Sequence, residues 1–109
     1  MHLEYRAREA EPMILEVAML QVKPGQDAAF EAAFREASPI IASMAGYRGH
    51  RLRRCLEAES KYLLTVEWDR LEDHTEGFRG SPEYQRWRAL LHHFYDPFPV
   101  VEHYTDVAY

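Results

Sequence analysis

Histidine is the residue type in this chain best suited to moving protons, and His74 has a setting that favours such a role. It is spaced with Leu71 and Phe78 so that all three share the inner face of a short predicted helix. An imidazole placed there can act as a general base toward an acidic C–H or O–H group of a substrate. A packed histidine, hydrogen-bonded to backbone, is an alternative of equal weight.

The spacing of the histidines argues against a metal centre. They occupy positions 2, 50, 74, 92, 93 and 103, and no two lie three or four residues apart on a predicted helix. The sequence also lacks the glycine-rich strings that bind nucleotides and the GxSxG string of acyl-enzyme hydrolases. We therefore expect neither a bound metal nor a cofactor.

Aromatic residues could give the same region a flat apolar pocket for a polycyclic ligand. The candidates for its lining are Tyr62, Trp68, Phe78 and Trp87. Such a set more commonly forms an ordinary hydrophobic core. Arg79 follows the short helix and is a candidate to hold a carboxylate or phenolate, although a solvated arginine is the commoner case.

Composition limits the classes of protein to which the chain can belong. Its 109 residues, 47% of them hydrophobic, fit one globular domain. A net charge of −5 has the wrong sign for a general binder of nucleic acid or of an anionic membrane. Cys55 is the only cysteine, which suits a reducing compartment, and no apolar run approaches the ~20 residues that span a bilayer. We expect a cytoplasmic protein.

The elements that must position these side chains follow the order β-α-β-β-α-β. Branched aliphatic runs bounded by turn signals predict strands at 13–22, 47–56, 61–68 and 100–107. This order is typical of a ferredoxin-like α+β fold, in which an antiparallel sheet carries helices on one face. Residues 1–12 are charged and non-periodic, so we expect a tail there, followed by a single domain over 13–109.

Helix boundaries are marked by capping residues. The first helix is predicted to begin near Asp27 and to end before Gly46, with a bend at Pro39. Asp69 is predicted to cap the short helix that carries His74. The last helix is predicted to have Ser81 as its cap and proline in its first position.

Two strands are apolar on both faces of the predicted sheet. In the strand at 13–22, Ala18 and Leu20 lie on one face and Val17 and Met19 on the other, and the strand at 61–68 repeats this pattern. An antiparallel sheet with one face in water should alternate apolar and polar residues. A second copy of the chain would cover the other face, so we expect a homodimer in which the two sheets stack into a barrel.

Three segments resemble the antibiotic biosynthesis monooxygenase family. They are MILEVAMLQVKPGQ, GYRGHRLRRCLE and above all YLLTVEWDRLEDHTEGFRGSPEYQRWRALLHHFYDPFPVVEHY, within residues 13 to 106. The most specific part is the strand that ends in Trp68, the helix with His74 and Phe78, and the helix restart at Ser81–Tyr84. The resemblance implies a dimeric α+β barrel with a pocket in each subunit between the sheet and its helices.

The family includes cofactor-free oxygenases of polycyclic anthrones or quinols, and haem-degrading monooxygenases. The haem-degrading branch has an Asn, a Trp and a His where this chain has Ala18, Gly77 and Trp87, so the resemblance does not imply haem degradation. Our leading interpretation is a cofactor-independent monooxygenase of a small aromatic or polycyclic metabolite, with His74 as base. The alternatives are a dimer that binds a small aromatic or haem-like ligand without catalysis, and a purely structural dimer with a filled core.

Overall fold

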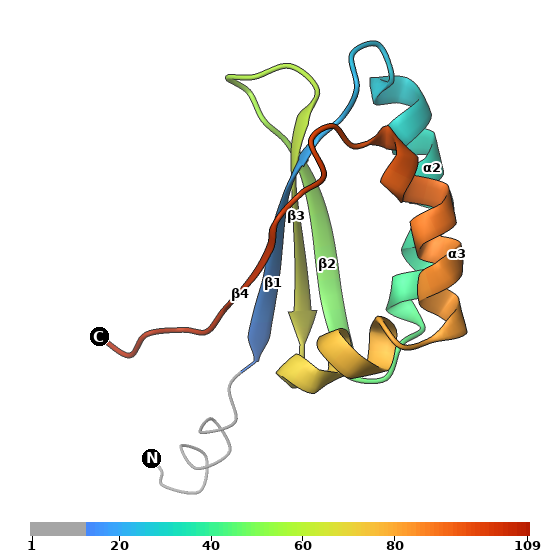
Figure 1. The fold of residues 1–109 in the computed structure, drawn as a ribbon. Helices are drawn as coiled ribbons and strands as arrows, with labels where there is room; N and C mark the ends of the chain where they lie inside the picture. The colour runs from blue at the N-terminus through green and yellow to red at the C-terminus, as the bar shows by residue number, and fades with distance from the viewer. Residues whose placement is uncertain (1–12) are drawn as a thin grey trace, which may run out of the picture.

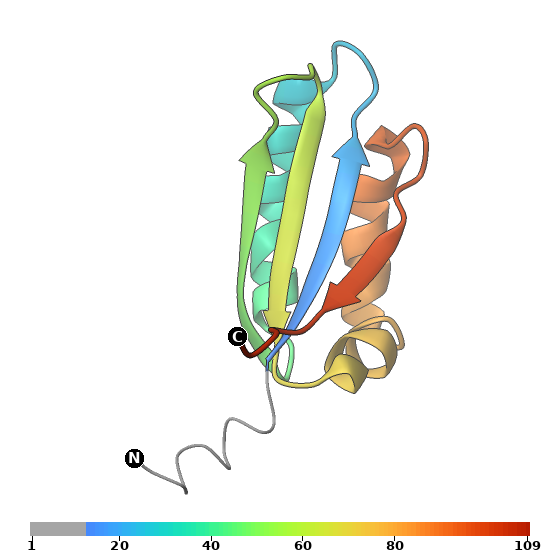
Figure 2. The same cartoon turned by 90° about the vertical axis from the view of Figure 1, so that its left-hand side faces the viewer.

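The protein is built on a four-stranded antiparallel sheet with the strand order β2-β3-β1-β4. A computed structural model describes residues 13–109. Its strands are β1 (Ile14–Gln21), β2 (Tyr47–Arg54), β3 (Lys61–Trp68) and β4 (Val101–Tyr104). β1 and β3 are the central pair and are matched along their whole length. Figure 2 shows the four strands side by side, with the helices behind them.

Two helices, α2 (Asp27–Ala42) and α3 (Pro82–Leu91), pack against one face of the sheet (Figure 1). A short π-helical segment, η1 (Asp73–Phe78), lies between β3 and α3, and a 3-10 turn, η2 (His92–Phe94), follows α3. The predicted order β-α-β-β-α-β and the ferredoxin-like α+β fold are confirmed. No described helix has the length and apolarity needed to cross a membrane.

The start of α3 is the one that the sequence predicts. Ser81 Oγ accepts a hydrogen bond from the Tyr84 backbone N–H at 3.1 Å, and Pro82 fills the first helical position. The cap satisfies an amide that the helix cannot, and proline has no amide to satisfy. α2 continues through Pro39 to Ala42, and the bend at Pro39 stays a prediction.

The turn after α2 requires a glycine. Gly46 has a φ of +82°, a left-handed conformation that residues with a Cβ adopt only at a cost. A Cβ at this position would also collide with the carboxyl group of Asp73 in η1. Gly46 therefore lets the α2–β2 turn pack directly against the segment that carries His74.

Two strand ends differ from the predicted ones. β2 ends at Arg54 rather than Leu56, because the chain leaves the sheet there and Leu56 is 92% exposed. β4 covers only Val101–Tyr104, because it pairs with no more of β1 than Leu15–Ala18.

The predicted cap of the short helix was also wrong. Asp73, not Asp69, accepts the hydrogen bond from the backbone N–H of Arg70, at 3.1 Å. The carboxylate of Asp69 instead lies 3.6 Å from the guanidinium of Arg48. The segment winds as a π-helix, whose wider turn does not match the spacing that a capping box assumes.

No described element covers the face of the sheet opposite the helices (Figure 2). Leu15, Val17 and Leu63 are half-buried on this outer face, and Met19 is 54% exposed. An uncovered row of large apolar side chains is the feature from which the sequence predicts a second copy of the chain.

Candidate active site

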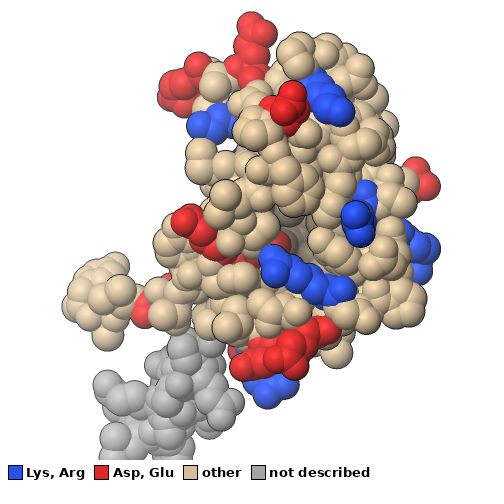
Figure 3. Space-filling view, viewed as in Figure 1, with Lys and Arg blue, Asp and Glu red and all other residues tan. Residues whose placement is uncertain are grey.

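A cavity of about 410 Å³ lies between the inner face of the sheet and α3. Ala18 and Leu64 contribute to its sheet side, and Phe78 and Trp87 to its helix side. Figure 3 shows a hollow between these two layers, with acidic and basic side chains beside it. Pockets for small organic ligands measure about 300–1,000 Å³ and are mostly apolar, so this cavity falls in their range.

A buried carboxyl group lies on the sheet side of the cavity. Glu16 of β1 shares the inner face with Ala18, lines the cavity and is only 6% exposed. Its Oε1 accepts a hydrogen bond from the indole Nε1–H of Trp68 at 2.9 Å. No described residue donates a hydrogen bond to Oε2. The bond from Trp68 thus holds the carboxyl while leaving its second oxygen without a partner among residues 13–109.

His74 connects Glu16 to a second histidine. Its Nε2 lies 3.4 Å from Glu16 Oε1, and its Nδ1 shares a hydrogen bond of 2.8 Å with His103 Nε2. His103 belongs to β4 and lies opposite Glu16 in the β1–β4 register. The imidazole of His74 also stacks on Trp68, with ring centroids 5.6 Å apart and planes 21° apart. We call Glu16, His74 and His103 the acid–histidine chain.

Burial decides the charge states of the acid–histidine chain. Desolvation raises the pKa of Glu16 against the smaller lowering effects of the Trp68 bond and the Arg79 charge. Desolvation, assisted by Arg79 and His103, lowers the pKa of His74 to about 3. The pKa of His103 is lowered for the same reasons, burial and Arg79. Because His74 is neutral at physiological pH, its contact with Glu16 is a hydrogen-bonding contact and not an ion pair.

Arg79 supplies the positive charge of the cavity. It follows η1 and lines the cavity, and within residues 13–109 its guanidinium makes no hydrogen bond or ion pair. A guanidinium with free donors at the edge of an apolar pocket suits an anionic oxygen such as a phenolate or carboxylate.

The comparisons with known proteins identify the family. A sequence model of the family "Antibiotic biosynthesis monooxygenase" matches residues 13–90. The chain belongs to this family. The uncharacterised protein YczJ of Bacillus subtilis is 62% identical over 95 residues, which make up 87% of this chain and 100% of YczJ.

Solved structures of this monooxygenase family have the same fold. One from Bordetella bronchiseptica is 36% identical, with a TM-score of 0.84 over 89% of this chain and 99% of that chain. SnoaB of Streptomyces nogalater, a cofactor-independent oxygenase, is 19% identical, with a TM-score of 0.68 over 90% of this chain and 94% of that chain. At that identity, the likeness to SnoaB shows the shared fold alone.

The structure brings four of the six residues predicted for the site of this family member to one cavity. His74, Phe78, Arg79 and Trp87 all line it. Trp68 does not, because it is fully buried beneath His74, where it holds Glu16 through its indole N–H. It therefore supports the site from below.

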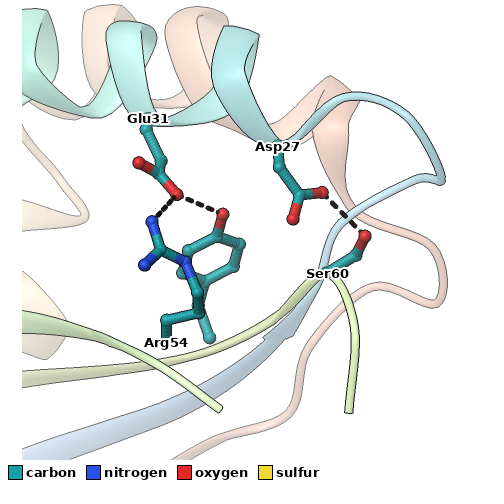
Figure 4. A network of polar contacts seen from close by, with 5 residues as sticks. Asp27, Glu31, Arg54 and Ser60 are labelled. Atoms are coloured by element: carbon teal, nitrogen blue, oxygen red, sulfur yellow. Dashed lines mark hydrogen bonds and ion pairs between the residues drawn. The ribbon is translucent and has the colours of Figure 1, made fainter. Parts of the chain in front are cut away.

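Tyr62 also lies outside the cavity, on the α2 side of the sheet. Its hydroxyl donates to Glu31 Oε2 at 2.6 Å, and Arg54 donates to the same oxygen at 2.7 Å. Figure 4 shows this contact beside the bond from Ser60 to Asp27. Burial and the bond to Glu31 raise the pKa of Tyr62 to about 12, so it stays a neutral donor. The network ties α2 to the sheet.

Three residues of the site were missed from the sequence. Glu16 had a signal, since a carboxylate between Ile14 and Ala18 interrupts the apolar inner face of a strand. For His103 the alternation of β4 left open whether it or Glu102 faces the pocket, and only the register with β1 decides this. His92 follows the apolar stripe of the last helix without belonging to it, yet it lines the cavity, and Phe98 packs on its ring at a centroid distance of 4.9 Å.

Proposed function

We propose that this family member is a cofactor-independent monooxygenase of a small aromatic or polycyclic metabolite, bound between the sheet and α3. The acid–histidine chain at the edge of an apolar cavity carries the proposal, because it places groups that exchange protons beside a site for a flat ligand. Membership of the family supports it. The single cysteine, Cys55, supports a location in the reducing cytoplasm.

The proposed reaction uses O₂ as its only co-substrate. Removal of a proton from the substrate leaves an electron-rich anion, which can reduce O₂ without help from a metal or a flavin. A ring methylene becomes a carbonyl, one oxygen atom enters the product and the other leaves as water with the two hydrogens, so that RCH₂R′ + O₂ gives RC(=O)R′ + H₂O. The protein must take up the first proton, stabilise the anion and exclude bulk water.

The cavity has a residue for each of these tasks. His74 lies between the carboxyl of Glu16 and the imidazole of His103, so the site built around it can take up a proton and pass it on. Arg79 stabilises the negative charge that develops on the substrate. Phe78 and Trp87 provide apolar ring surfaces for the substrate and reduce the access of water.

We also propose that two copies of the chain form a dimer through their outer sheet faces. Large apolar side chains, among them Val17 and Met19, lie on that face. Arg51 and Arg53 on β2 and Glu67 on β3 provide charges of both signs around them. Related by a two-fold axis, such a face can match basic groups of one copy with acidic groups of the other.

The geometry of His74 also favours a second candidate, a dimer that binds an aromatic or haem-like ligand without turning it over. Both ring nitrogens of His74 lie next to protein atoms, which is the arrangement of a satisfied buried histidine. In that case the same cavity binds its ligand, and no proton leaves it.

Oxygen uptake separates the two candidates. The protein is mixed with a panel of anthrones and hydroquinones, and O₂ consumption is recorded against buffer and against denatured protein. The proposal predicts saturable uptake with one O₂ consumed for each product molecule. Binding seen by thermal shift, with no uptake above the controls for any compound, would support the binding protein instead.

A further inference from the structure

We propose that Glu16 is the catalytic residue that accepts the substrate proton, and that His74 and His103 pass this proton to solvent at β4. The inference rests on the proposed function and names the group within the site that meets the substrate. It is built on three observations: a carboxyl oxygen without a partner in the described part of the chain, a histidine whose two nitrogens are occupied, and a second histidine on an edge strand.

The first observation concerns the carboxyl group. The Glu16 side chain is 8% exposed, and its residue lines the cavity. Oε1 is occupied by Trp68 Nε1–H, whereas Oε2 has no hydrogen-bond partner among the described residues. A buried oxygen without a partner costs free energy unless a ligand or solvent satisfies it. A substrate O–H or acidic C–H group in the cavity would meet this atom.

The second observation is that His74 is poorly placed to meet the substrate itself. Its Nε2 faces Glu16 Oε1 at 3.4 Å, and its Nδ1 is bonded to His103 Nε2 at 2.8 Å. Any proton that His74 accepts or releases therefore comes from or goes to one of these two neighbours. His74 is on this basis a link between them.

The third observation is the position of His103. It lies on β4, which is an edge strand of the sheet, and it is half-buried while His74 is 3% exposed. Its Nδ1 makes no hydrogen bond with residues 13–109. The acid–histidine chain thus runs from the cavity toward the surface of the molecule.

Proton transfer along this chain balances. The chain starts with ionised Glu16, a proton on His74 Nε2 and a proton on His103 Nε2. The carboxylate takes the substrate proton, and once the carboxyl is protonated the two neutral rings exchange tautomer, so that each carries its proton on Nδ1. Glu16 then passes its proton to His74 Nε2. His74 Nδ1–H then donates to His103 Nε2, and His103 releases its own proton from Nδ1 to water. Reversal of the same steps returns a proton when the oxygenated substrate loses water.

The groups around Glu16 decide when it can act as a base. The titratable and charged residues around the cavity, from every element packed against it, are His74, Arg79, Tyr84, His92, Tyr95 and His103. Arg79 is the only one with a fixed charge, and it favours the ionised carboxylate. Burial has the opposite and larger effect and raises the pKa of Glu16. Glu16 therefore acts as a base only at a pH above its ordinary pKa of 4.5.

A test that needs no substrate uses ¹⁵N NMR of histidine-labelled protein between about pH 5 and pH 8. The proposal predicts that the His74 proton moves from Nδ1 to Nε2 as Glu16 ionises. Glu16→Gln should abolish this exchange while leaving the fold intact. Glu102→Gln, on the outer face of β4, is the matched control and should keep the exchange. A His74 that keeps one tautomer throughout the range in the unchanged protein would overturn the proposal.

The kinetic test uses any panel compound that the protein oxidises. Glu16→Gln should lower kcat by about 10²- to 10⁴-fold, the usual range for loss of a general base, while an anthraquinone still binds. His103→Gln should give a smaller loss that added imidazole restores, and Glu102→Gln should show no change. Full activity of Glu16→Gln beside an inactive His74→Ala would overturn the proposal and leave the oxygenase intact. Tautomer exchange without oxygen uptake would support the chain and count against the oxygenase.

Discussion

At the scale of single residues, burial makes His74 a poor free-standing base. A pKa of about 3 keeps it neutral, but it also means that the isolated imidazole binds a proton weakly at physiological pH. Glu16 has the opposite shift, because burial disfavours the negative charge of a carboxylate. Passing a proton from Glu16 to His74 is therefore harder than the ordinary pKa values of the two groups suggest, so His74 must give up its own proton to His103 in the same step.

The lowered pKa of His74 predicts a specific loss of stability in acid. The unfolded chain titrates this histidine near 6.5, whereas the folded protein keeps it neutral down to about 3. Below pH 6.5 the unfolded state therefore binds a proton that the folded state does not. The free energy of unfolding decreases as the pH is lowered from 6.5 toward 3.

Urea unfolding at about pH 7 and pH 5 measures the effect. The free energy of unfolding should fall by about 2 kcal/mol more for the unchanged protein than for His74→Gln. Glu16 titrates in both proteins, so its opposite contribution cancels in the difference. An equal fall in the two proteins would show that His74 titrates normally in the folded state.

At the scale of elements, the position of His74 depends on contacts made by η1. Asp73 accepts a hydrogen bond from the Arg70 N–H and packs against Gly46 of the α2–β2 turn. His74 follows directly. A substitution in this turn should therefore lower the stability of the protein and also change the position of His74 in the site.

Substitution of Gly46 tests this link. Gly46→Ala must place a Cβ at positive φ and against the Asp73 carboxyl, so we expect a loss of about 2–4 kcal/mol in the free energy of unfolding. Gly25→Ala is the matched control, because Gly25 also has positive φ but has nothing near the added Cβ. It should lose only about 1 kcal/mol. Equal losses would mean that the contact with Asp73 has no weight.

At the scale of the whole molecule, the outer sheet face is the surface through which we propose that two copies of the chain bind. Helices cover only one face of the sheet (Figure 1), and the other carries Met19 at 54% exposure. Each cavity is on the helix side, so dimer formation would leave the two sites separate. We therefore expect dimerisation to stabilise the sheet that carries Glu16 without closing the cavity.

Sedimentation at micromolar concentration should find a dimer. Met19→Glu places a charge in the apolar face and should shift the protein to monomers. Leu56→Glu, at a residue that is 92% exposed in the β2–β3 loop, should remain dimeric. A monomeric unchanged protein would remove the explanation for the apolar outer faces of β1 and β3.

Much of this architecture could be predicted from the sequence, because periodicity and capping are local signals. β3 was predicted with its observed bounds, and the Ser81 cap of α3 was predicted with its proline. The acid–histidine chain was not, since Glu16, His74 and His103 are brought together only by the β1–β4 register and by a π-helical turn. Tyr62 and Trp68 were assigned to a pocket because they are aromatic, yet their polar atoms bond to carboxylates away from a ligand.

The central claim is that the site around His74 takes up a proton during oxygenation. The most direct measurement compares oxygen uptake by the unchanged protein and by His74→Ala, with one active substrate across a range of pH. We predict that kcat/KM falls by about 10²- to 10⁴-fold in His74→Ala. In the unchanged protein, it should rise with pH through the raised pKa of Glu16, above 4.5, and not near 3, where His74 itself would titrate. Equal rates and the same pH profile in the two proteins would contradict the account.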